Sequence, residues 1–387
     1  MKSKLKLISI ALIIIICING IMPVNSLAVD IDPAIMAAME SGMATINGVS
    51  VPVNSMVLDF NNKKIKNFDT FKVELAQLPL LTRVELKGSN LSNKQMEELK
   101  LLYPNVKFVW NIRLGGYWTL STDQVAFSCN KGEGPNLTNA DVEVLKYCTD
   151  MVALDLGHNR FTDLSFVKYM PDLRVLIISD GIVSDLTPLK YCKNLVYFEG
   201  WYNKFSDLSP LQYLVNLKDI NVAHCPKCND VTPLLHLPAL ERIYMSYCNV
   251  SQASINELKK TFPNATIEMV EYYSDRAGWR KHNRYYEMRK MYKKNFISDA
   301  FTPDYNSLVY FAKVFDVAYY MDRYPEVVAV VGNSPVDLLY YFLNDGIYQF
   351  QVASPNFDVT QYINEHPELV AVYGGDIGAY LRHYLYN

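Results

Sequence analysis

The chain has 387 residues, of which 50% are hydrophobic and 20% charged, with 37 basic and 40 acidic side chains and a net charge of −3. This composition excludes a disordered chain and gives no support to a strongly basic nucleic-acid-binding protein. Seven cysteines are too few for a disulfide scaffold of this length, which itself predicts two or three folded units.

The first 28 residues have the order of a secretory signal peptide. Three lysines precede the apolar run 7–18, and Ser-Leu-Ala at 26–28 gives a small-x-small cleavage pattern. The apolar run is shorter than the roughly 20 residues of a membrane-spanning helix. We therefore expect a secreted or cell-surface protein that is not inserted in a membrane after cleavage, with an uncleaved anchor as the alternative. A linker is expected over residues 29–50.

Residues 151–250 contain five segments that fit L-x-x-L-x-L-x-x-N/C, the pattern of leucine-rich repeats. The segments begin at Met151, Leu173, Leu195, Leu217 and Leu240, so the period is 22 residues with one extra residue near 226–229. Gly200 is the one apolar position that no apolar side chain fills. The second half of each repeat is similar to D-L-x-P-L. These features resemble the internalin-like class of bacterial leucine-rich repeats.

One such repeat cannot bury its own leucines, so neighbouring repeats must stack and share a continuous core. The pattern therefore predicts an α/β fold, a leucine-rich repeat solenoid whose parallel β-sheet lines the concave face. More divergent repeats over 81–105 and 240–264 resemble each other at a constant offset of 159 residues. With further strands at 57–60 and 124–127, we expect about eight strands in one solenoid over residues 51–271.

Side chains alternate across a strand, so the residues between the inward leucines face outward on the concave side. Aromatic and charged residues gather there, and Tyr, Trp and Arg are enriched in binding hot spots. We therefore predict a ligand-binding surface formed by Tyr197, Glu199, Trp201, Tyr202, Asp219, Asn221, Arg242, Tyr244 and Tyr247. The alternative is that some of these rings pack against flanking loops or the C-terminal domain.

Four aspartates recur once per repeat, at Asp163, Asp185, Asp207 and Asp230. A calcium site requires six or more oxygen ligands around one point, whereas these carboxylates form a single file. Each one precedes a convex turn. Capping of these turns is therefore the favoured interpretation.

The cysteines also follow the repeat. Cys148 and Cys192 share an apolar register and predict buried thiols, while Cys225 and Cys248 fill the Asn/Cys position. The sequence Cys-Pro-Lys-Cys that ends at Cys228 has no second CxxC with which to bind zinc. We expect a structural loop there, with a local disulfide as an open alternative, and no metal site.

Catalytic motifs are lacking. The sequence contains no GxSxG, HExxH, P-loop or dinucleotide fingerprint, and no motif connects its six histidines to a Ser or Cys nucleophile. We therefore expect a protein that is not an enzyme, that has no cofactor and that does not bind nucleic acid.

The composition changes after residue 271. Of the 28 tyrosines, 18 lie in residues 272–387, and eight basic groups lie within residues 276–294. We expect the basic and aromatic segment 272–298 to close the end of the solenoid, because a solenoid end requires a cover. A basic patch for an anionic polymer or membrane is the alternative.

A second repeat with a period of 42 residues fills the C-terminal region. Phe-Asp-Val at 315–317 recurs at 357–359, and Pro-Glu-Val-Val-Ala-Val at 325–330 recurs in similar form at 367–372. We predict a small all-helical domain over 299–387 that contains two units, 315–356 and 357–387. The pattern resembles a tandem helical repeat of exported bacterial proteins.

These observations favour non-catalytic recognition of a protein or glycan ligand by the concave face of a secreted or cell-surface solenoid. The alternative is a structural or scaffold protein that is associated with the cell envelope through its C-terminal helical repeats.

Overall fold

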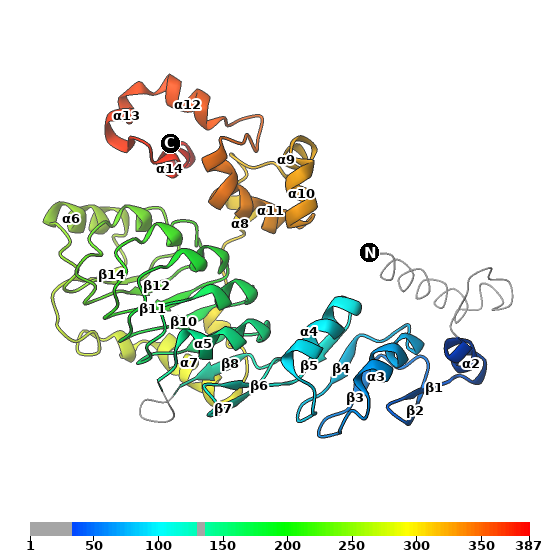
Figure 1. The fold of residues 1–387 in the computed structure, drawn as a ribbon. Helices are drawn as coiled ribbons and strands as arrows, with labels where there is room; N and C mark the ends of the chain where they lie inside the picture. The colour runs from blue at the N-terminus through cyan, green and yellow to red at the C-terminus, as the bar shows by residue number, and fades with distance from the viewer. Residues whose placement is uncertain (1–32, 130–135) are drawn as a thin grey trace. The chain divides into compact units, whose positions relative to one another are not determined.

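The computed structural model describes residues 33–129 and 136–387, so the expected signal peptide lies outside the described residues. The chain forms two compact units, of which the first ends at Asp123 and the second begins at Gln124. Both contain parallel strands connected by helical segments (Figure 1).

The first unit begins with helix α2 (Pro33–Ser41) and the hairpin β1 (Met43–Ile46)–β2 (Val49–Pro52). These elements stand where a linker was expected. Asn47 and Gly48 both have positive φ, of 52° and 79°, which is the backbone that a two-residue hairpin turn requires. The Asn47 N–H also donates to Glu74 Oε2 at 2.6 Å, which ties the turn to helix α3 (Phe68–Glu74).

A short parallel sheet follows in the same unit. Its order is β3-β4-β5, and its strands are β3 (Val57–Asp59), β4 (Arg83–Glu85) and β5 (Lys107–Val109). Helix α3 and helix α4 (Asn93–Leu102) connect them, and Ser92 and Gln95 form a capping box at the start of α4.

The single solenoid expected over residues 51–271 is divided. After β5 the chain forms an antiparallel hairpin from β6 (Asn111–Leu114) and β7 (Trp118–Ser121). Gly115 and Gly116 have φ values of 56° and 68°, which side chains with a Cβ rarely adopt, and they allow the chain to reverse. An antiparallel hairpin cannot continue a parallel ladder, so a second sheet begins after it.

The second unit contains a parallel sheet of seven strands in the order β14-β13-β12-β11-β10-β9-β8. Its strands are β8 (Ala126–Ser128), β9 (Ala153–Asp155), β10 (Val175–Ile177), β11 (Tyr197–Glu199), β12 (Asp219–Asn221), β13 (Arg242–Tyr244) and β14 (Thr266–Glu268). Ala153 pairs with Val175, and Val175 with Tyr197, so the ladder advances by the predicted 22 residues.

The inward side chains of these strands are fully buried, as the repeat requires. They include Leu154, Leu176, Phe198, Ile220 and Ile243, which stack as one apolar column. This arrangement confirms the predicted leucine-rich repeat solenoid.

The repeated aspartates lie at the starts of the convex turns. Their carboxylates accept from backbone N–H groups two residues on, at 2.7 Å for Asp163 to Ser165, 2.7 Å for Asp185 to Thr187, 2.8 Å for Asp207 to Ser209 and 2.9 Å for Asp230 to Thr232. These bonds fix the entry into the 3-10 helices η4 (Ser165–Tyr169), η5 (Thr187–Tyr191), η6 (Ser209–Leu211) and η7 (Thr232–Leu234).

The side chain at the Asn/Cys position bonds to loop backbone on every rung except the one where Gly181 takes this position. Asn203 Nδ2 donates to the Gly200 carbonyl at 3.1 Å, and its Oδ1 accepts from the Val183 N–H at 2.9 Å. Cys225 Sγ accepts from the Asn203 N–H at 3.3 Å, and Cys248 Sγ donates to the Val222 carbonyl at 3.0 Å. All six cysteines of the described residues are buried free thiols.

The C-terminal region is helical. Three helices, α9 (Val317–Arg323), α10 (Pro325–Val331) and α11 (Pro335–Tyr341), recur 42 residues later as α12 (Val359–Glu365), α13 (Pro367–Tyr373) and α14 (Ile377–Tyr386). The first helix of each triplet is capped by an aspartate, Asp316 or Asp358, whose carboxylate accepts from the first turn.

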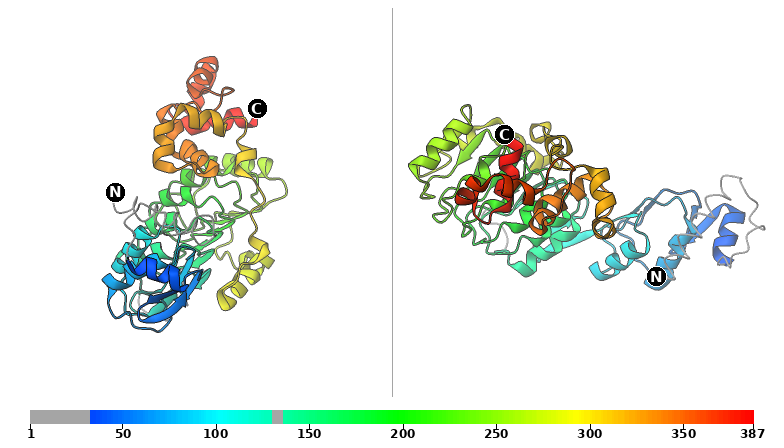
Figure 2. Two further views of the ribbon diagram at one scale, coloured as in Figure 1. Left: turned by 90° about the vertical axis from the view of Figure 1, so that its right-hand side faces the viewer. Right: turned by 90° about the horizontal axis from the view of Figure 1, so that it is seen from above.

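These helices pack against the turns that follow η5, η6 and η7. Tyr213 and Val215 of the solenoid share an apolar core with Phe311 and Leu338 of the helical region. The Tyr386 hydroxyl donates to the His236 carbonyl at 2.6 Å. In the left view of Figure 2 the orange and red helices stand above the solenoid, and the yellow helix α7 (Asn283–Lys294) stands to its side.

Within the described residues, no helix has both the length and the apolar character that would let it cross a membrane.

Gly200 offers a test of the core. A Cβ built there would lie 2.8 Å from Phe198 Cζ, because the Phe198 ring fills the space that an aliphatic side chain takes in other repeats. We expect Gly200→Leu, which restores the repeat pattern, to lower the free energy of unfolding by about 1–3 kcal/mol through overpacking. Urea unfolding monitored by circular dichroism measures the change.

The double variant Phe198→Leu/Gly200→Leu is the control, since it gives both positions the side chain of the pattern. It should recover much of the stability lost in Gly200→Leu. If the double variant is destabilised as much as Gly200→Leu or more, the Phe198 ring is not what takes the space of the missing side chain at position 200.

Candidate functional site

The structure buries six of the nine residues that were predicted to form an open concave face. Tyr197, Glu199, Asp219, Asn221, Arg242 and Tyr244 are each at most 5% exposed. Tyr202 and Tyr247 are about half exposed, at 52% and 50%, and Trp201 is partly exposed. The interpretation of the whole face as a ligand surface is therefore corrected, and the alternative that some rings pack against another part of the chain holds.

The cover is residues 272–301, hereafter the strap, which contains η8 (Trp279–Lys281), α7 and η9 (Asp299–Phe301). Trp279, the first residue of η8, is fully buried. Its ring lies 5.1 Å from that of Tyr197 and 4.9 Å from that of Tyr244, and the Arg242 guanidinium lies 4.4 Å above it. The tilted ring contacts and the cation together fix the strap to β11 and β13.

A second contact point is a buried ion network around Asp219. Arg284 donates to both Asp219 oxygens, at 2.6 Å and 2.7 Å, and Arg242 donates to Asp219 Oδ1 at 2.8 Å. Burial alone would raise the pKa of Asp219, but hydrogen bonds and charge from both arginines outweigh it and hold the pKa below its usual range. The carboxylate therefore stays ionised beneath the strap.

The far end of the strap reaches the first strand of the same sheet. Asn295, which has a left-handed backbone at φ 49°, accepts from the Val125 and Ala126 N–H groups at 2.9 Å and 3.1 Å. The segment 272–298 therefore crosses the concave face and does not close the end of the solenoid as predicted. The reason is apolar area: Ala153, Val175 and Ile177 face outward from the strands and pack under α7.

Beyond the strands, the chain turns at an edge that we call the rim. His158, Asp180, Tyr202, His224 and Tyr247 occupy equivalent rim positions, and all five have left-handed φ, between 53° and 65°. A residue with this backbone is uncommon unless it is glycine. Here it directs one side chain per repeat away from the sheet.

The rim side chains and the start of the strap form a continuous group of rings, hereafter the aromatic ridge, made of Tyr202, His224, Tyr247, Tyr272 and Tyr273. The His224 and Tyr247 rings stack at 4.8 Å with only 7° between their planes, and Tyr272 meets His224 edge-on at 4.7 Å. His224 Nε2 also bonds to the Tyr272 carbonyl oxygen at 2.7 Å. The four tyrosines are each about half exposed, so the ridge is a solvent-facing apolar surface.

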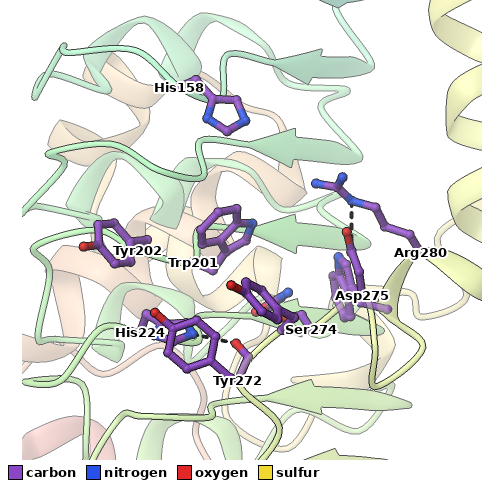
Figure 3. A pocket seen from close by; sticks show the side chains of 11 residues that line it. His158, Trp201, Tyr202, His224, Tyr272, Ser274, Asp275 and Arg280 are labelled. Carbon is purple, nitrogen blue, oxygen red and sulfur yellow. Dashed lines mark hydrogen bonds and ion pairs between the residues drawn. The ribbon is translucent and has the colours of Figure 1, made fainter. Parts of the chain in front are cut away.

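A cavity of about 340 Å³, hereafter the rim pocket, lies between the rim and the strap (Figure 3). Trp201 lines it between His158 on one side and Ser274 on the other. Asp275 and Arg280 face it from the strap, and their ion pair is 3.2 Å long. The pocket thus combines rings from the solenoid with charged groups from the strap.

Glu199 lies behind these groups as a buried carboxylate that several donors hold. It accepts from the Trp279 Nε1–H at 2.6 Å, the Tyr197 hydroxyl at 2.7 Å and the Trp201 Nε1–H at 3.1 Å. Arg280 Nη2 lies 3.6 Å from it. Partial burial raises the pKa of Asp275, an effect that Arg280 opposes and the charge of Glu199 reinforces.

Among the described residues, the two histidines of the pocket are hydrogen-bonded to a carboxylate and to a backbone carbonyl, and not to a Ser or Cys nucleophile. His158 Nδ1 lies 2.8 Å from Asp180 Oδ2, and His224 is held by the Tyr272 carbonyl. In residues 33–129 and 136–387, no group of three or more His, Cys, Asp or Glu side chains is placed to hold a metal ion. The arrangement is suited to binding a ligand by stacking and hydrogen bonding.

Sequence reasoning placed Trp201, Tyr202 and Tyr247 at the open surface but missed the strap's contribution to it. Tyr272, Tyr273, Asp275 and Arg280 were assigned to an end cap. The apolar outward residues at Ala153, Val175 and Ile177 were the signal that another segment covers the face.

The ion network makes the strap testable. Arg284→Met removes the donors from Asp219, which then keeps only Arg242, so we expect a loss of about 1–3 kcal/mol in the free energy of unfolding at pH 7. Lys290→Met on the same helix removes only an exposed pair with Glu287 and should change stability by less than about 0.5 kcal/mol. Urea unfolding of both variants beside the unsubstituted protein gives the comparison.

The difference in unfolding free energy between the unsubstituted protein and Arg284→Met depends on pH. Because the folded pKa of Asp219 is lowered, its stabilising contribution is complete above the unfolded value of about 3.9 and is lost as the pH falls through the folded pKa. The gap between the unsubstituted protein and Arg284→Met should therefore narrow below about pH 4. A gap that stays constant from pH 7 to pH 3 would contradict the role of an ionised Asp219.

Comparison of the sequence with protein-family models finds no match, and comparison with curated proteins finds no relative. Among solved structures, an internalin (inlF) from Listeria monocytogenes is 14% identical, covers 62% of this chain and 87% of its own, and has a TM-score of 0.32. An internalin C2 (inlC2) from the same species is 21% identical, with 54% and 91% covered and a TM-score of 0.27. A leucine-rich repeat protein from Leptospira interrogans is 18% identical, with 55% and 54% covered and a TM-score of 0.30. Similarities of this size support no conclusion about function, so the fold assignment rests on the strand register of this chain.

Proposed function

We propose that the protein recognises an extracellular ligand without catalysis, and that it does so at the rim through the aromatic ridge and the rim pocket. The observation that carries this proposal is the continuous set of half-exposed rings beside a formed cavity. Exposed aromatic groups gain little for folding, whereas Tyr and Trp dominate binding energy where a partner covers them.

The concave strands contribute indirectly. Their acids and rings hold the strap, and the strap supplies Tyr272, Tyr273, Asp275 and Arg280 to the pocket. A second hollow of about 620 Å³ shares Tyr202 and His224 with the rim pocket and adds Tyr247, so the ridge has a hollow on each side. A ligand that lies across the ridge would contact both.

A capture experiment tests this proposal. The purified protein and its Trp201→Ala/Tyr202→Asn variant are immobilised, and the molecules that each retains from host extracts and from the producer's own envelope are compared. Asn at position 202 tolerates the left-handed backbone that Tyr202 adopts, so the change should remove the ring and preserve the loop. We expect partner retention to fall at least tenfold, because each anchor ring contributes about 1–2 kcal/mol.

Tyr169→Ala is the matched control. Tyr169 is exposed to a similar degree, at 49%, but it lies in the convex 3-10 helix η4. Retention should be unchanged in this variant. Equal loss in both variants, or no loss in either, would argue against recognition at the rim.

The C-terminal repeats support a second candidate function, a scaffold that is attached to the cell envelope. Val330 in α10 and Val372 in α13 occupy equivalent positions of the 42-residue repeat and are 85% and 70% exposed. Two apolar side chains exposed at the same place in each unit fit a repeated docking contact.

This second function makes a separate prediction. Val330→Ser/Val372→Ser should shift the protein from the envelope fraction to the medium, as measured by fractionation of the producing cells. Val309→Ser, which changes a 72% exposed valine outside the repeated pair, is the control and should not move the protein. Envelope retention that is equal in all three proteins would exclude attachment through these valines.

A further inference from the structure

Asn221 lines the rim pocket, and its side-chain amide has a hydrogen-bond donor that is unpaired within the described residues. Asn221 is fully buried, and its Nδ2 bonds to no other group in the described part of the chain. Its Oδ1 accepts from the Ala223 N–H at 3.2 Å, so the amide cannot be reversed and Nδ2 must point elsewhere. Buried polar groups in native proteins are nearly always paired, and Asn221 lines the pocket. An acceptor on a bound ligand would complete this pairing once the side chains that cover Nδ2 move aside.

The walls of the pocket are aromatic. Trp201 and Tyr202 come from the rim, and Tyr272 and Tyr273 come from the strap. The face of an aromatic ring carries partial negative charge. Aliphatic C–H groups that neighbouring oxygens polarise carry partial positive charge, and they pack favourably against such faces.

The charges at the pocket argue against an ionic ligand. Arg280 lies between two carboxylates, 3.2 Å from Asp275 and 3.6 Å from Glu199. A ligand cation would have to compete with this guanidinium, and a ligand anion would approach two acids that face a single base. A neutral hydroxyl group meets neither obstacle, since it can donate to Asp275 and accept from Asn221.

We propose that the rim pocket binds a single neutral sugar ring, the accessible residue of a glycan, with its C–H face against the aromatic walls and its hydroxyl edge toward Asn221 and Asp275. This inference deepens the proposed function and rests on it. The volume of about 340 Å³ is at the small end of ligand pockets, which suits one ring and not an extended chain.

The test uses ligands that share one ring and differ in charge. The purified full chain is titrated, with ligand-observed NMR, with N-acetylglucosamine and the methyl glycosides of glucose, galactose and mannose as neutral probes. Glucosamine is the cationic probe and glucuronate the anionic probe. We expect at least one neutral sugar to bind with a dissociation constant on the order of 1 mM, and both charged probes to bind at least tenfold more weakly.

Variants of the residues that line the pocket locate the binding. Asn221→Asp keeps the acceptor that the Ala223 N–H requires and removes the free N–H donor, so it should weaken the neutral sugar at least tenfold. Since this change adds a buried acid, its folding is checked by circular dichroism, and Trp201→Ala, which removes a wall of the pocket, must weaken binding similarly. Asp275→Asn replaces the charged acceptor of the sugar hydroxyl with a neutral one and should weaken binding of the neutral sugar about fivefold, whereas Tyr169→Ala in the convex helix η4 should leave the affinity unchanged.

Tighter binding of either charged probe, or no saturable binding of any neutral probe up to about 100 mM, overturns the proposal. The capture experiment separates this failure from failure of the proposed function. The captured partner is oxidised with periodate, which cleaves vicinal diols. If capture requires Trp201 and Tyr202 but persists after periodate treatment, the sugar proposal is wrong and recognition at the rim still holds. If capture does not depend on either residue, both the sugar proposal and recognition at the rim are wrong.

Discussion

The arrangement of this protein depends on two carboxylates that are buried on the concave side of the solenoid. Glu199 and Asp219 are at most 1% exposed, and a buried charge is destabilising unless donors surround it. The strap supplies these donors through the Trp279 indole and the Arg284 guanidinium. Removing the strap would leave both acids with part of their hydrogen bonds and would expose the apolar strands beside them. The concave face therefore serves mainly to hold the strap.

The rim side chains are regularly spaced because each repeat places one of them at the same position. The backbone ladder continues past the strands, since the N–H groups of His158, Asp180, Tyr202 and His224 each donate to a carbonyl of the next rung at 2.8–2.9 Å. These bonds fix a left-handed backbone that an isolated turn would hold only with strain. The side chains consequently project in a regular row, and the stacking of His224 on Tyr247 follows from that spacing. A surface held this way keeps its shape before a ligand arrives, which lowers the entropic cost of binding.

Local periodicity carried most of the information that the sequence held about the fold. The 22-residue period predicted the strand register, the aspartate turns and the Asn/Cys contacts, because each of these recurs with the repeat. It could not reveal that Gly115 and Gly116 allow a hairpin that interrupts the solenoid, although Asn47-Gly48 is a hairpin signal that can be read directly. The strap was harder to foresee, since Trp279 meets Glu199 across 80 residues of sequence and no local pattern encodes that contact. This long-range packing buries Tyr197, Asp219 and Arg242. Tyr202 and Tyr247 remain half exposed because the rim lies beyond the edge of the strap.

Two segments of the C-terminal third thus cover different parts of the same solenoid. The strap covers the concave strands, and the helical repeats cover the turns after η5, η6 and η7, where Tyr213 enters their core. Both contacts bury apolar side chains, and the strap contact also buries Glu199 and Asp219 together with their donors. The rim lies outside both contacts, and there large aromatic side chains remain exposed next to a formed cavity that Asn221 helps to line. Exposed rings and an unpaired buried amide donor are both unfavourable in the unliganded protein, and the proposed ligand would cover the rings and supply an acceptor for the amide.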